Sequence, residues 1–183
     1  MNVDAQLLHE VDTIARRAGR AIMAVYARDY AVQDKADQSP LTEADLAAHA
    51  VIAHDLGQLI PSLPILSEEA VEAFPQSFAG ERYWLVDPLD GTKEFIKRNG
   101  EFTVNIALIE QGRPALGVVH GPAIEVTYSA AYGLGAFRQR KGGASESIHV
   151  AVHRDGTPWR VVGSRSHAGD SLNTFLQRLG AHE

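Results

Sequence analysis

The sequence predicts an α+β fold, and three observations support this prediction. Two amphipathic helical segments open the chain, several short apolar runs separated by turn residues follow, and one more helical segment lies near the end. Because helices and strands occur in separate stretches, an antiparallel α+β arrangement is favoured over a doubly wound parallel sheet. The 183 residues are 45% hydrophobic and 22% charged, a composition that supports a buried core.

The first two helices are predicted from their apolar periodicity. Apolar residues recur every three or four positions at Val3, Leu7, Val11, Ile14, Ala18, Ile22 and Val25, and the pattern stops at 26–29. A polar loop at 34–40 follows. The second helix is expected to open at Thr42-Glu43-Ala44-Asp45, which has the pattern of a capping box, and its predicted apolar stripe comprises Leu46, Ala50, Ala53, Leu56 and Ile60.

From residue 63 onward the pattern is typical of strands. Short apolar runs at 63–66 and 83–86 end in carboxylates, and further strands are expected at 102–109, 115–120 and 126–130, with a hairpin connection at 110–113. Residues 140–145 are rich in glycine and basic side chains and predict a linker. Beyond it we expect strands at 149–152 and 160–163 and a helix at about 168–179.

The composition excludes several classes of protein. Lys and Arg number 17 against 23 Asp and Glu, and a net charge of −6 argues against binding to a nucleic-acid polymer. The absence of cysteine excludes disulfides, thiolate nucleophiles, cysteine-ligated zinc and iron–sulfur clusters. No apolar run reaches the length of about 18 residues that a transmembrane segment needs, and no signal peptide is visible at the start. We therefore expect a soluble intracellular protein.

The residues that most strongly indicate chemistry follow the predicted strand at 83–86. The strand delivers Asp87 at its end, and a proline and Gly91 permit a sharp turn, so that Asp87 and Asp90 can point into one small volume. Thr92 stands where a new helix can begin, and backbone amides at a helix start bind phosphate. Two carboxylates beside an anion site suit Mg²⁺, which retains water ligands and contacts substrate phosphate.

A third carboxylate can complete this cluster. Glu68 or Glu69, after the run at 63–66, is the candidate, and such a cluster can hold two metal ions about 3.5–4 Å apart, one activating water and one stabilising the leaving oxygen. Composition and spacing alone leave an ordinary surface turn at Asp87–Gly91 as the alternative, because Asp-Pro and Asp-Gly are common turn dipeptides. Similarly, a solvated strand end is the alternative for the Glu pair.

The motif Asp87-Pro88-Leu89-Asp90-Gly91-Thr92 resembles the inositol monophosphatase superfamily of Mg²⁺-dependent, lithium-sensitive phosphatases. Its continuation at 93–107 resembles, more particularly, the CysQ-type 3′(2′),5′-bisphosphate nucleotidases of that superfamily. Segments 35–45, 66–69 and 164–168 also resemble this branch, in the same order along the chain. The resemblance covers essentially all 183 residues.

The resemblance implies a layered αβαβα sugar-phosphatase fold in two parts. Residues 1–155 are expected to form an N-terminal α+β metal-binding domain, and residues 156–183 the start of an incomplete C-terminal α/β domain. Members of the family continue to a Trp-Asp motif whose aspartate completes the second metal site, whereas this sequence ends at Glu183. We therefore expect the second metal site to lack one ligand.

The resemblance also implies a set of site residues and two or three Mg²⁺ ions as cofactors. Glu68 is expected to bind the first metal, Asp87 to bridge both, the Leu89 carbonyl to bind the first, and Asp90 to bind the second. The catalytic residues are expected to be Asp45 and Thr92, with the hydrogen-bonded Thr92 hydroxyl helping to activate water. Substrate contacts are expected from Glu68, Leu89, Asp90, Gly91, Thr92 and His167.

The activity implied is hydrolysis of adenosine 3′,5′-bisphosphate to AMP and phosphate, which supports sulfate assimilation. The expected partner is this small nucleotide, and the expected location is the cytoplasm, with peripheral association with the cytoplasmic face of the inner membrane left open. Two alternatives remain: an inositol or sugar monophosphatase, and a non-catalytic metal- or phosphate-binding fragment. The apolar face of the last predicted helix, at 168–179, also leads us to expect self-association.

Overall fold

The computed structural model describes residues 3–34, 40–75, 81–163 and 170–183. Its internal contacts divide the chain into two units, Met1–Ile148 and His149–Glu183. The expected boundary at 155/156 therefore lies inside the second unit, a few residues beyond the division that the contacts give.

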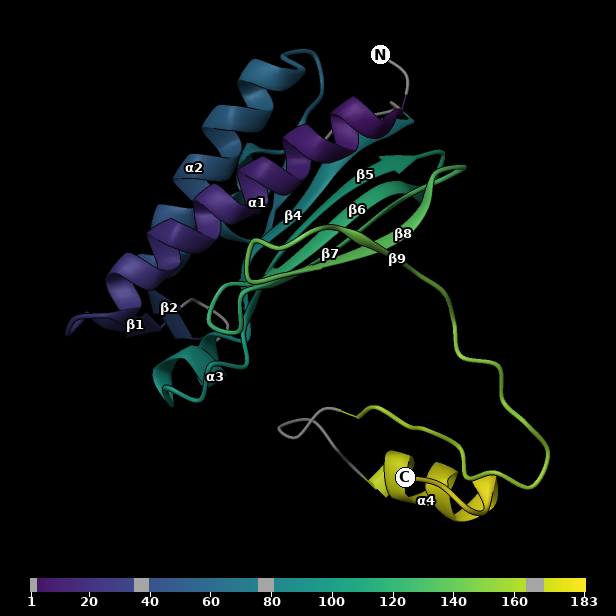
Figure 1. Ribbon diagram of the computed structural model, residues 1–183. Helices are drawn as coiled ribbons and strands as arrows, with labels where there is room; N and C mark the ends of the chain where they lie inside the picture. Colours follow the sequence, from purple (N-terminus) through teal and green to yellow (C-terminus); the bar gives the residue numbers. More distant parts are fainter. Residues whose placement is uncertain (1–2, 35–39, 76–80, 164–169) are drawn as a thin grey trace. The chain divides into compact units, whose positions relative to one another are not determined.

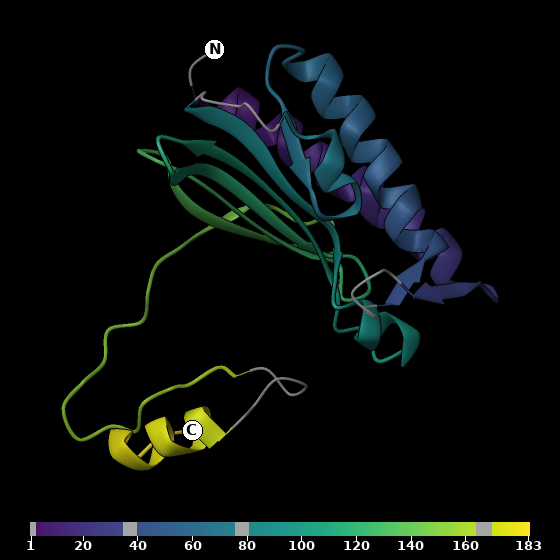
Figure 2. The ribbon, with the colours of Figure 1, turned by 180° about the vertical axis from the view of Figure 1, so that it is seen from behind.

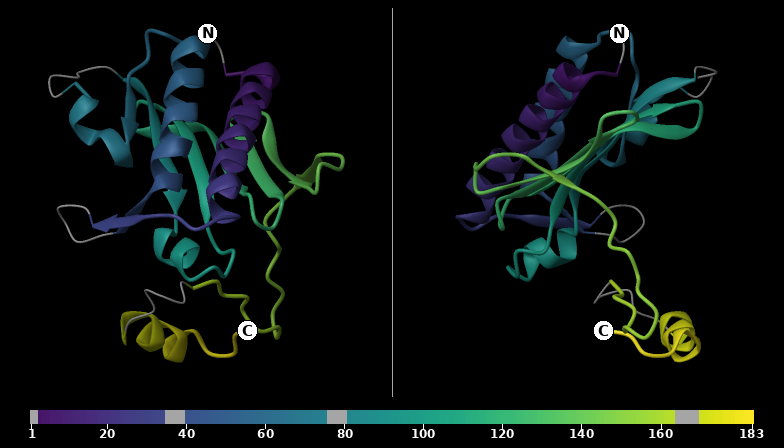
Figure 3. Two further views of the ribbon diagram at one scale, coloured as in Figure 1. Left: turned by 90° about the vertical axis from the view of Figure 1, so that its left-hand side faces the viewer. Right: turned by 45° about the vertical axis from the view of Figure 1, so that its right-hand side comes forward.

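In the first unit two long helices cover one face of a seven-stranded sheet (Figures 1 and 3). The helices are α1 (Ala5–Tyr26) and α2 (Glu43–Leu59). The sheet has the order β3-β4-β5-β6-β7-β8-β9 and consists of β3 (Ile65–Ser67), β4 (Arg82–Asp90), β5 (Thr103–Glu110), β6 (Arg113–Gly121), β7 (Val126–Ala131), β8 (Gly135–Arg140) and β9 (Glu146–Ile148). Within the described sheet β3 and β4 pair in parallel and all other neighbouring strands pair antiparallel, which confirms the α+β prediction.

Five shorter elements complete the described chain. Strands β1 (Val32–Asp34) and β2 (Pro40–Thr42) pair antiparallel, at the two ends of the predicted polar loop. A 3₁₀ helix, η1 (Glu68–Ala73), follows β3, and the short helix α3 (Thr92–Ile96) follows β4, as the sequence predicts at Thr92. Helix α4 (Asp170–Leu179) belongs to the second unit.

Helix α1 forms as its periodicity predicts. Asp4 caps its first turn by accepting a hydrogen bond from the Leu7 amide at 2.9 Å. The predicted stripe from Leu7 to Val25 is buried against α2 and the sheet, while Val3 is half-buried.

Helix α2 begins at the predicted capping box but buries a different face. Its buried apolar residues are Ala44, Ala48, Ile52 and Leu56, whereas Leu46 is 49% exposed and Ala50 is exposed. The predicted stripe was therefore wrong in its first half. The physical reason is Asp45, which is fully buried and hydrogen-bonded, and which turns its own side of the helix inward.

Alternation along the strands separates the two faces of the sheet. Trp84, Val86, Val104, Ile106 and Val118 are buried on the helix side. Their neighbours along the strands, Leu85, Asp87, Asn105 and Val119, lie on the opposite face, where Leu85 and Val119 are exposed. Figure 2 shows the first unit from behind the view of Figure 1.

Other differences from the sequence prediction concern strands. The run at 83–86 is part of a strand that continues to Asp90 through a register shift between Asp87 and Asp90. Strands β8 and β9 were not predicted, and the predicted linker at 140–145 lies in their hairpin connection.

The predictions for the second unit were partly wrong. The strands predicted at 149–152 and 160–163 do not form, and the described residues of this unit contain one isolated bridge, between Trp159 and His182. The predicted last helix is present as α4, although residues 164–169, where it was expected to start, lie outside the described residues. None of the described helices combines the length and the apolar character that crossing a bilayer requires.

Candidate metal and phosphate site

The parallel pairing of β3 with β4 brings the predicted carboxylates together. Ser67 pairs with Val86, so the next residues along the two strands, Glu68 and Asp87, are neighbours. The two carboxyl groups are close enough for the negative charge of Glu68 to raise the pKa of Asp87.

The surroundings of Asp87 raise its pKa, as expected of a buried carboxyl group beside other negative charges. Burial, above all, and then the negative charges of Glu68 and Asp90 raise the pKa of Asp87 from 3.8 to about 7, against a lowering effect of its hydrogen bond from the Leu89 backbone. One of its oxygens, Oδ1, is buried with no hydrogen-bond partner. A buried acceptor without a donor is costly, and a cation would satisfy it.

Asp90 is more exposed than Asp87. It lies beyond the register shift of β4, is exposed, and accepts a hydrogen bond from Asn105 Nδ2 at 3.1 Å. Asn105 pairs with Asp87 across β4 and β5, and Thr103 Oγ1 donates to Asn105 Oδ1 at 3.0 Å. The sequence analysis missed Asn105. Its signal is the polar alternation of Thr103 and Asn105 in an otherwise apolar strand.

The residues present fit a hard cation. Among the described residues no three Asp, Glu or His side chains converge closely enough to form a metal site by themselves. The predicted ligand set, however, includes the Leu89 backbone carbonyl, and the unpartnered Asp87 Oδ1 beside Glu68 is an oxygen donor of the kind that Mg²⁺ prefers.

The turn after Asp90 depends on Gly91. Gly91 has a φ of +94° and forms the N-cap of α3, and a Cβ atom there would lie 2.9 Å from the Glu101 carbonyl oxygen. Both the backbone angle and the close approach favour glycine. The turn sets the start of α3 directly beside Asp90, where the amides of the first helical turn have no acceptor within the helix.

Thr92 connects this turn to α2. Its Oγ1 lies 3.1 Å from Asp45 Oδ1 and 3.3 Å from the Leu89 carbonyl oxygen. The other carboxylate oxygen of Asp45 accepts from the Thr42 amide at 2.7 Å and from the Thr42 hydroxyl at 2.6 Å. The buried carboxylate is therefore held on both oxygens, and it fixes the position of the Thr92 hydroxyl.

Aromatic packing fastens α3 to the end of α1. Phe95 is fully buried and its ring centroid lies 4.9–5.2 Å from those of Tyr26, Tyr30 and Phe102. Arg98 donates to the carbonyl oxygens of Tyr26 at 2.6 Å and Arg28 at 2.8 Å. The guanidinium of Arg98 is thus used to close the last turn of α1.

A second residue that the sequence analysis missed, His49, contacts the residue that precedes Glu68. His49 Nδ1, on α2, lies 2.9 Å from Ser67 Oγ, and Ser67 directly precedes Glu68. Burial lowers the pKa of His49, so the ring is neutral at pH 7. Glu68, Asp87 and Asn105 line a cavity of about 600 Å³ whose other walls are largely apolar, including Val71 and Leu85.

The structure thus brings most of the predicted site residues to one place. Glu68 and Asp87 are in contact, Leu89, Asp90, Gly91 and Thr92 form the adjoining turn, and Asp45 reaches Thr92 from α2. His167 lies outside the described residues. The roles of these residues remain predictions.

Known proteins are similar to this chain over nearly its whole length. Residues 4–176 match the inositol monophosphatase family. The chain is 53% identical to a protein of Salmonella typhimurium named 3′(2′),5′-bisphosphate nucleotidase CysQ, over 97% of this chain and 71% of that protein. It is 52% identical to the protein of that name from Escherichia coli K12, with the same coverage.

Solved structures agree with this similarity. The crystal structure of CysQ from Bacteroides thetaiotaomicron, a bacterial member of the inositol monophosphatase family, superposes with a TM-score of 0.73 at 37% identity, covering 94% of this chain and 69% of that one. An IMPase from Thermotoga maritima superposes with a TM-score of 0.75 at 29% identity, covering 95% and 64%. This chain belongs to the inositol monophosphatase family.

Proposed function

We propose that this chain is a Mg²⁺-dependent 3′(2′),5′-bisphosphate nucleotidase, which converts adenosine 3′,5′-bisphosphate to AMP and phosphate. The observation that carries the proposal is the identity of 53% to a CysQ nucleotidase over 97% of the chain. The carboxylate pair of Glu68 and Asp87, beside a turn that suits a phosphate, supplies the matching chemistry.

In this proposal the metal ligands are Glu68, Asp87, the Leu89 carbonyl and Asp90, and they hold two or three Mg²⁺ ions. Bound Mg²⁺ makes water more acidic and neutralises charge on a phosphoryl group. The unpartnered oxygen of Asp87 and its raised pKa support a cation at this point, since a nearby cation would favour the ionised carboxylate.

Thr92 and Asp45 are the proposed catalytic pair. The Thr92 hydroxyl donates its proton to Asp45 Oδ1, which leaves the oxygen lone pairs of Thr92 free to accept a proton from an attacking water. Asp45 is a buried acceptor whose other oxygen is already held by Thr42, so the direction of the hydrogen bond is fixed. The pair therefore orients the water at no cost in reorganisation.

The proposed phosphate subsite is the turn from Leu89 to Thr92. Its backbone amides at the start of α3 point away from the helix and provide donors for phosphate oxygens. Glu68, Asp90 and His167 are the remaining proposed substrate contacts. His167 is proposed from the family resemblance alone.

A second candidate function is an inositol or sugar monophosphatase. The superposition on the Thermotoga maritima IMPase, with a TM-score of 0.75, favours it, because the metal-binding turn belongs to the whole family. The higher identity to CysQ nucleotidases ranks it second.

One experiment distinguishes the two candidates from a non-catalytic fragment. Phosphate release is measured from adenosine 3′,5′-bisphosphate and from inositol monophosphate on one preparation of the chain, with and without Mg²⁺. The proposal predicts Mg²⁺-dependent release that is faster from the bisphosphate. Equal or faster release from inositol phosphate favours the monophosphatase, and release from neither supports the fragment.

The same proposal includes several finer predictions. They are inhibition by lithium, a role in sulfur metabolism, and location in the cytoplasm or at the cytoplasmic face of the inner membrane. Self-association through residues 160–179 also remains a prediction.

A further inference from the structure

A second cavity, of about 590 Å³, lies on the helix side of the sheet and is lined by basic side chains. Its walls come from the middle of α1, the β6–β7 turn and the residues that follow β8. Arg16 and Arg20 of α1, Lys141 and the ring of His120 line it, together with Glu125. Arg16 is paired with Asp12, so the positive charge of this cavity comes from Arg20 and Lys141 against Glu125, in a chain whose net charge is −6.

Two of these cations have no charged partner. Within the part of the chain that the structure describes, the side chains of Arg20 and Lys141 form no ion pair or hydrogen bond, and both are exposed at the rim. The Lys141 amide donates to the Glu125 carbonyl oxygen at 2.7 Å, which fixes the backbone at this side of the rim. Basic side chains that converge on a cavity without counterions attract an anion.

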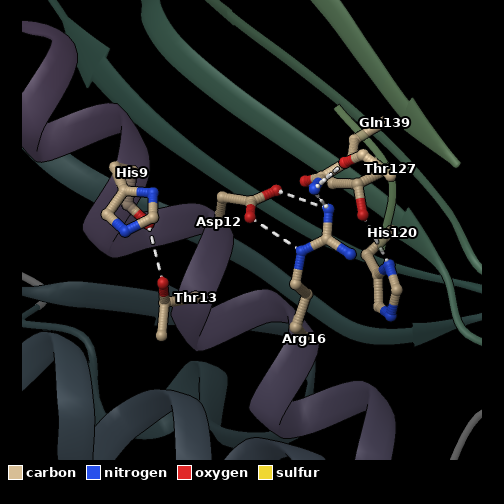
Figure 4. A network of polar contacts seen from close by, with 8 residues as sticks. His9, Asp12, Thr13, Arg16, His120, Thr127 and Gln139 are labelled. Carbon is tan, nitrogen blue, oxygen red and sulfur yellow. Dashed lines mark hydrogen bonds and ion pairs between the residues drawn. The ribbon is translucent and has the colours of Figure 1, made fainter. Parts of the chain in front are cut away.

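The third cation, Arg16, is held in place by hydrogen bonds to its neighbours (Figure 4). Its Nε donates to Asp12 Oδ2 at 2.7 Å, and its Nη2 donates to Gln139 Oε1 at 2.6 Å. Nη2 also lies 3.3 Å from Asp12 Oδ1, and together these contacts orient the guanidinium. A pre-oriented guanidinium loses little entropy when it binds phosphate.

The pKa of His120, in the wall of this cavity, is shifted by burial and by the charges nearby. Its ring is only 7% exposed, and Nδ1 lies 2.8 Å from Thr127 Oγ1. Burial, then Arg16 and, as the smallest cause, Arg20 lower the pKa of His120, whereas Asp12 and a backbone contact with Val126 raise it. The two arginines contribute positive potential at this ring, which Asp12 partly offsets.

The cavity depends on a glycine of α1. A Cβ atom at Gly19 would lie 2.6 Å from Cδ2 and 2.7 Å from Nε2 of His120, so only glycine lets the ring lie against the helix. The cavity is also separate from the candidate metal site. His120 lies on the helix side of the sheet, whereas Val119, which pairs with Asn105, lies on the same face as Asp87.

We propose that this cavity is a second anion site, which binds the phosphate group of a small organic phosphomonoester. Arg16, Arg20 and Lys141 contact the phosphate, and the apolar wall of Met23, Pro122 and Ala123 packs against the organic part. Glu125 at the rim repels a second phosphate, so the site prefers monophosphates to bisphosphates. The volume suits a ligand of nucleotide size.

The test measures binding of AMP and of inorganic phosphate by isothermal titration calorimetry at constant ionic strength, in the presence of EDTA. The variants are the double substitution Arg20→Gln/Lys141→Gln and, as a control with the same loss of charge elsewhere, Arg113→Gln/Arg154→Gln. A third variant, Asp90→Asn, alters the proposed metal site. The EDTA removes Mg²⁺, so phosphate binding that needs a metal is suppressed.

We expect one AMP to bind per chain, with phosphate alone binding more weakly because it lacks the apolar contact. The dissociation constant of AMP rises at least about tenfold in Arg20→Gln/Lys141→Gln, since two charge-assisted contacts are lost, and changes less than about twofold in the control and in Asp90→Asn. Three results would overturn the proposal: no binding by the unsubstituted chain, equal affinity in the Arg20/Lys141 variant, or an equal loss in the control.

Discussion

Thr92 and Asp45 lie in direct contact although 47 residues separate them: Thr92 Oγ1 is 3.1 Å from Asp45 Oδ1. Asp45 is also the N3 residue of the capping box that opens α2, and its second oxygen is held by Thr42. One buried carboxylate therefore both starts a helix and fixes the hydroxyl that we assign to water activation.

The Thr92 hydroxyl is expected to matter for turnover and little for metal binding. Thr92→Ala removes the proposed proton acceptor and should lower kcat at least about 100-fold. Thr92→Ser keeps the hydroxyl and should retain most of the activity. Phosphate-release assays at saturating Mg²⁺ measure both variants, and equal activity in Thr92→Ala and Thr92→Ser would refute the assignment.

Asp87 should make the metal-free chain less stable as pH rises. Its pKa is raised from 3.8 to about 7, mainly by burial. Between these values the folded chain holds a proton that the unfolded chain has lost, so the free energy of unfolding falls from about pH 4 to pH 7. Asp87→Asn removes this fall.

Urea unfolding in EDTA at pH 5 and at pH 8 tests this prediction. Asp87→Asn should be more stable than the unsubstituted chain, by a larger margin at pH 8 than at pH 5. The control Asp29→Asn, at an exposed position, should show no such difference. Added Mg²⁺ should stabilise the unsubstituted chain and not Asp87→Asn. A margin that is equal at both pH values would contradict the account.

Sequence periodicity predicted the elements whose own residues determine their burial. Helix α1 buries the stripe that its spacing indicates, because no polar group competes for that face. In α2 the stripe beginning at Leu46 was wrong, because Asp45 is buried with its carboxylate bonded to both Thr42 and Thr92, and Thr92 lies far away in the sequence. The apolar periodicity of a sequence carries no information about a polar contact between residues that are far apart in the chain.

The missed and the wrong strands have a related cause. Strand β8 consists of half-buried residues with charged side chains between glycine-rich turns, so its alternation is weak, and it forms because β7 offers a hydrogen-bonding edge. The runs at 149–152 and 160–163 have strand-forming residues but no neighbouring strand among the described residues.

The carboxylate cluster was predicted from its motif. Asn105 was missed because its role depends on the register between β4 and β5.

A side chain at Gly91 should destabilise the fold, whereas a methyl group added at Gly57 in the same unit should not. Gly91→Ala places a Cβ atom 2.9 Å from the Glu101 carbonyl oxygen at a φ of +94°, and it should cost about 1–3 kcal/mol of stability. Gly57→Ala, in the last turn of α2 with open space around it, should stabilise by about 0.5–1 kcal/mol. Thermal unfolding measures both, and similar effects at the two positions would contradict the role of the turn.

Asn105 is expected to orient Asp90. Asn105→Ala removes the amide that donates to Asp90 Oδ2 at 3.1 Å, so the affinity for Mg²⁺ should fall several-fold while the fold persists. Asn105→Asp replaces the donor with a second carboxylate and should disturb the site differently, by adding negative charge beside Asp90. Calorimetric titration of Mg²⁺ compares the variants, and unchanged affinity in Asn105→Ala would exclude the proposed support.

The rate of phosphate release from adenosine 3′,5′-bisphosphate by the unsubstituted chain and by Asp90→Asn, with and without Mg²⁺, tests the central claim most directly. Circular dichroism confirms that each protein is folded, and Asp29→Asn serves as the control for loss of one carboxylate. The account predicts release that requires Mg²⁺, persists in Asp29→Asn and falls at least about 100-fold in a folded Asp90→Asn protein. Release without Mg²⁺, or a near-normal rate in folded Asp90→Asn, would contradict it.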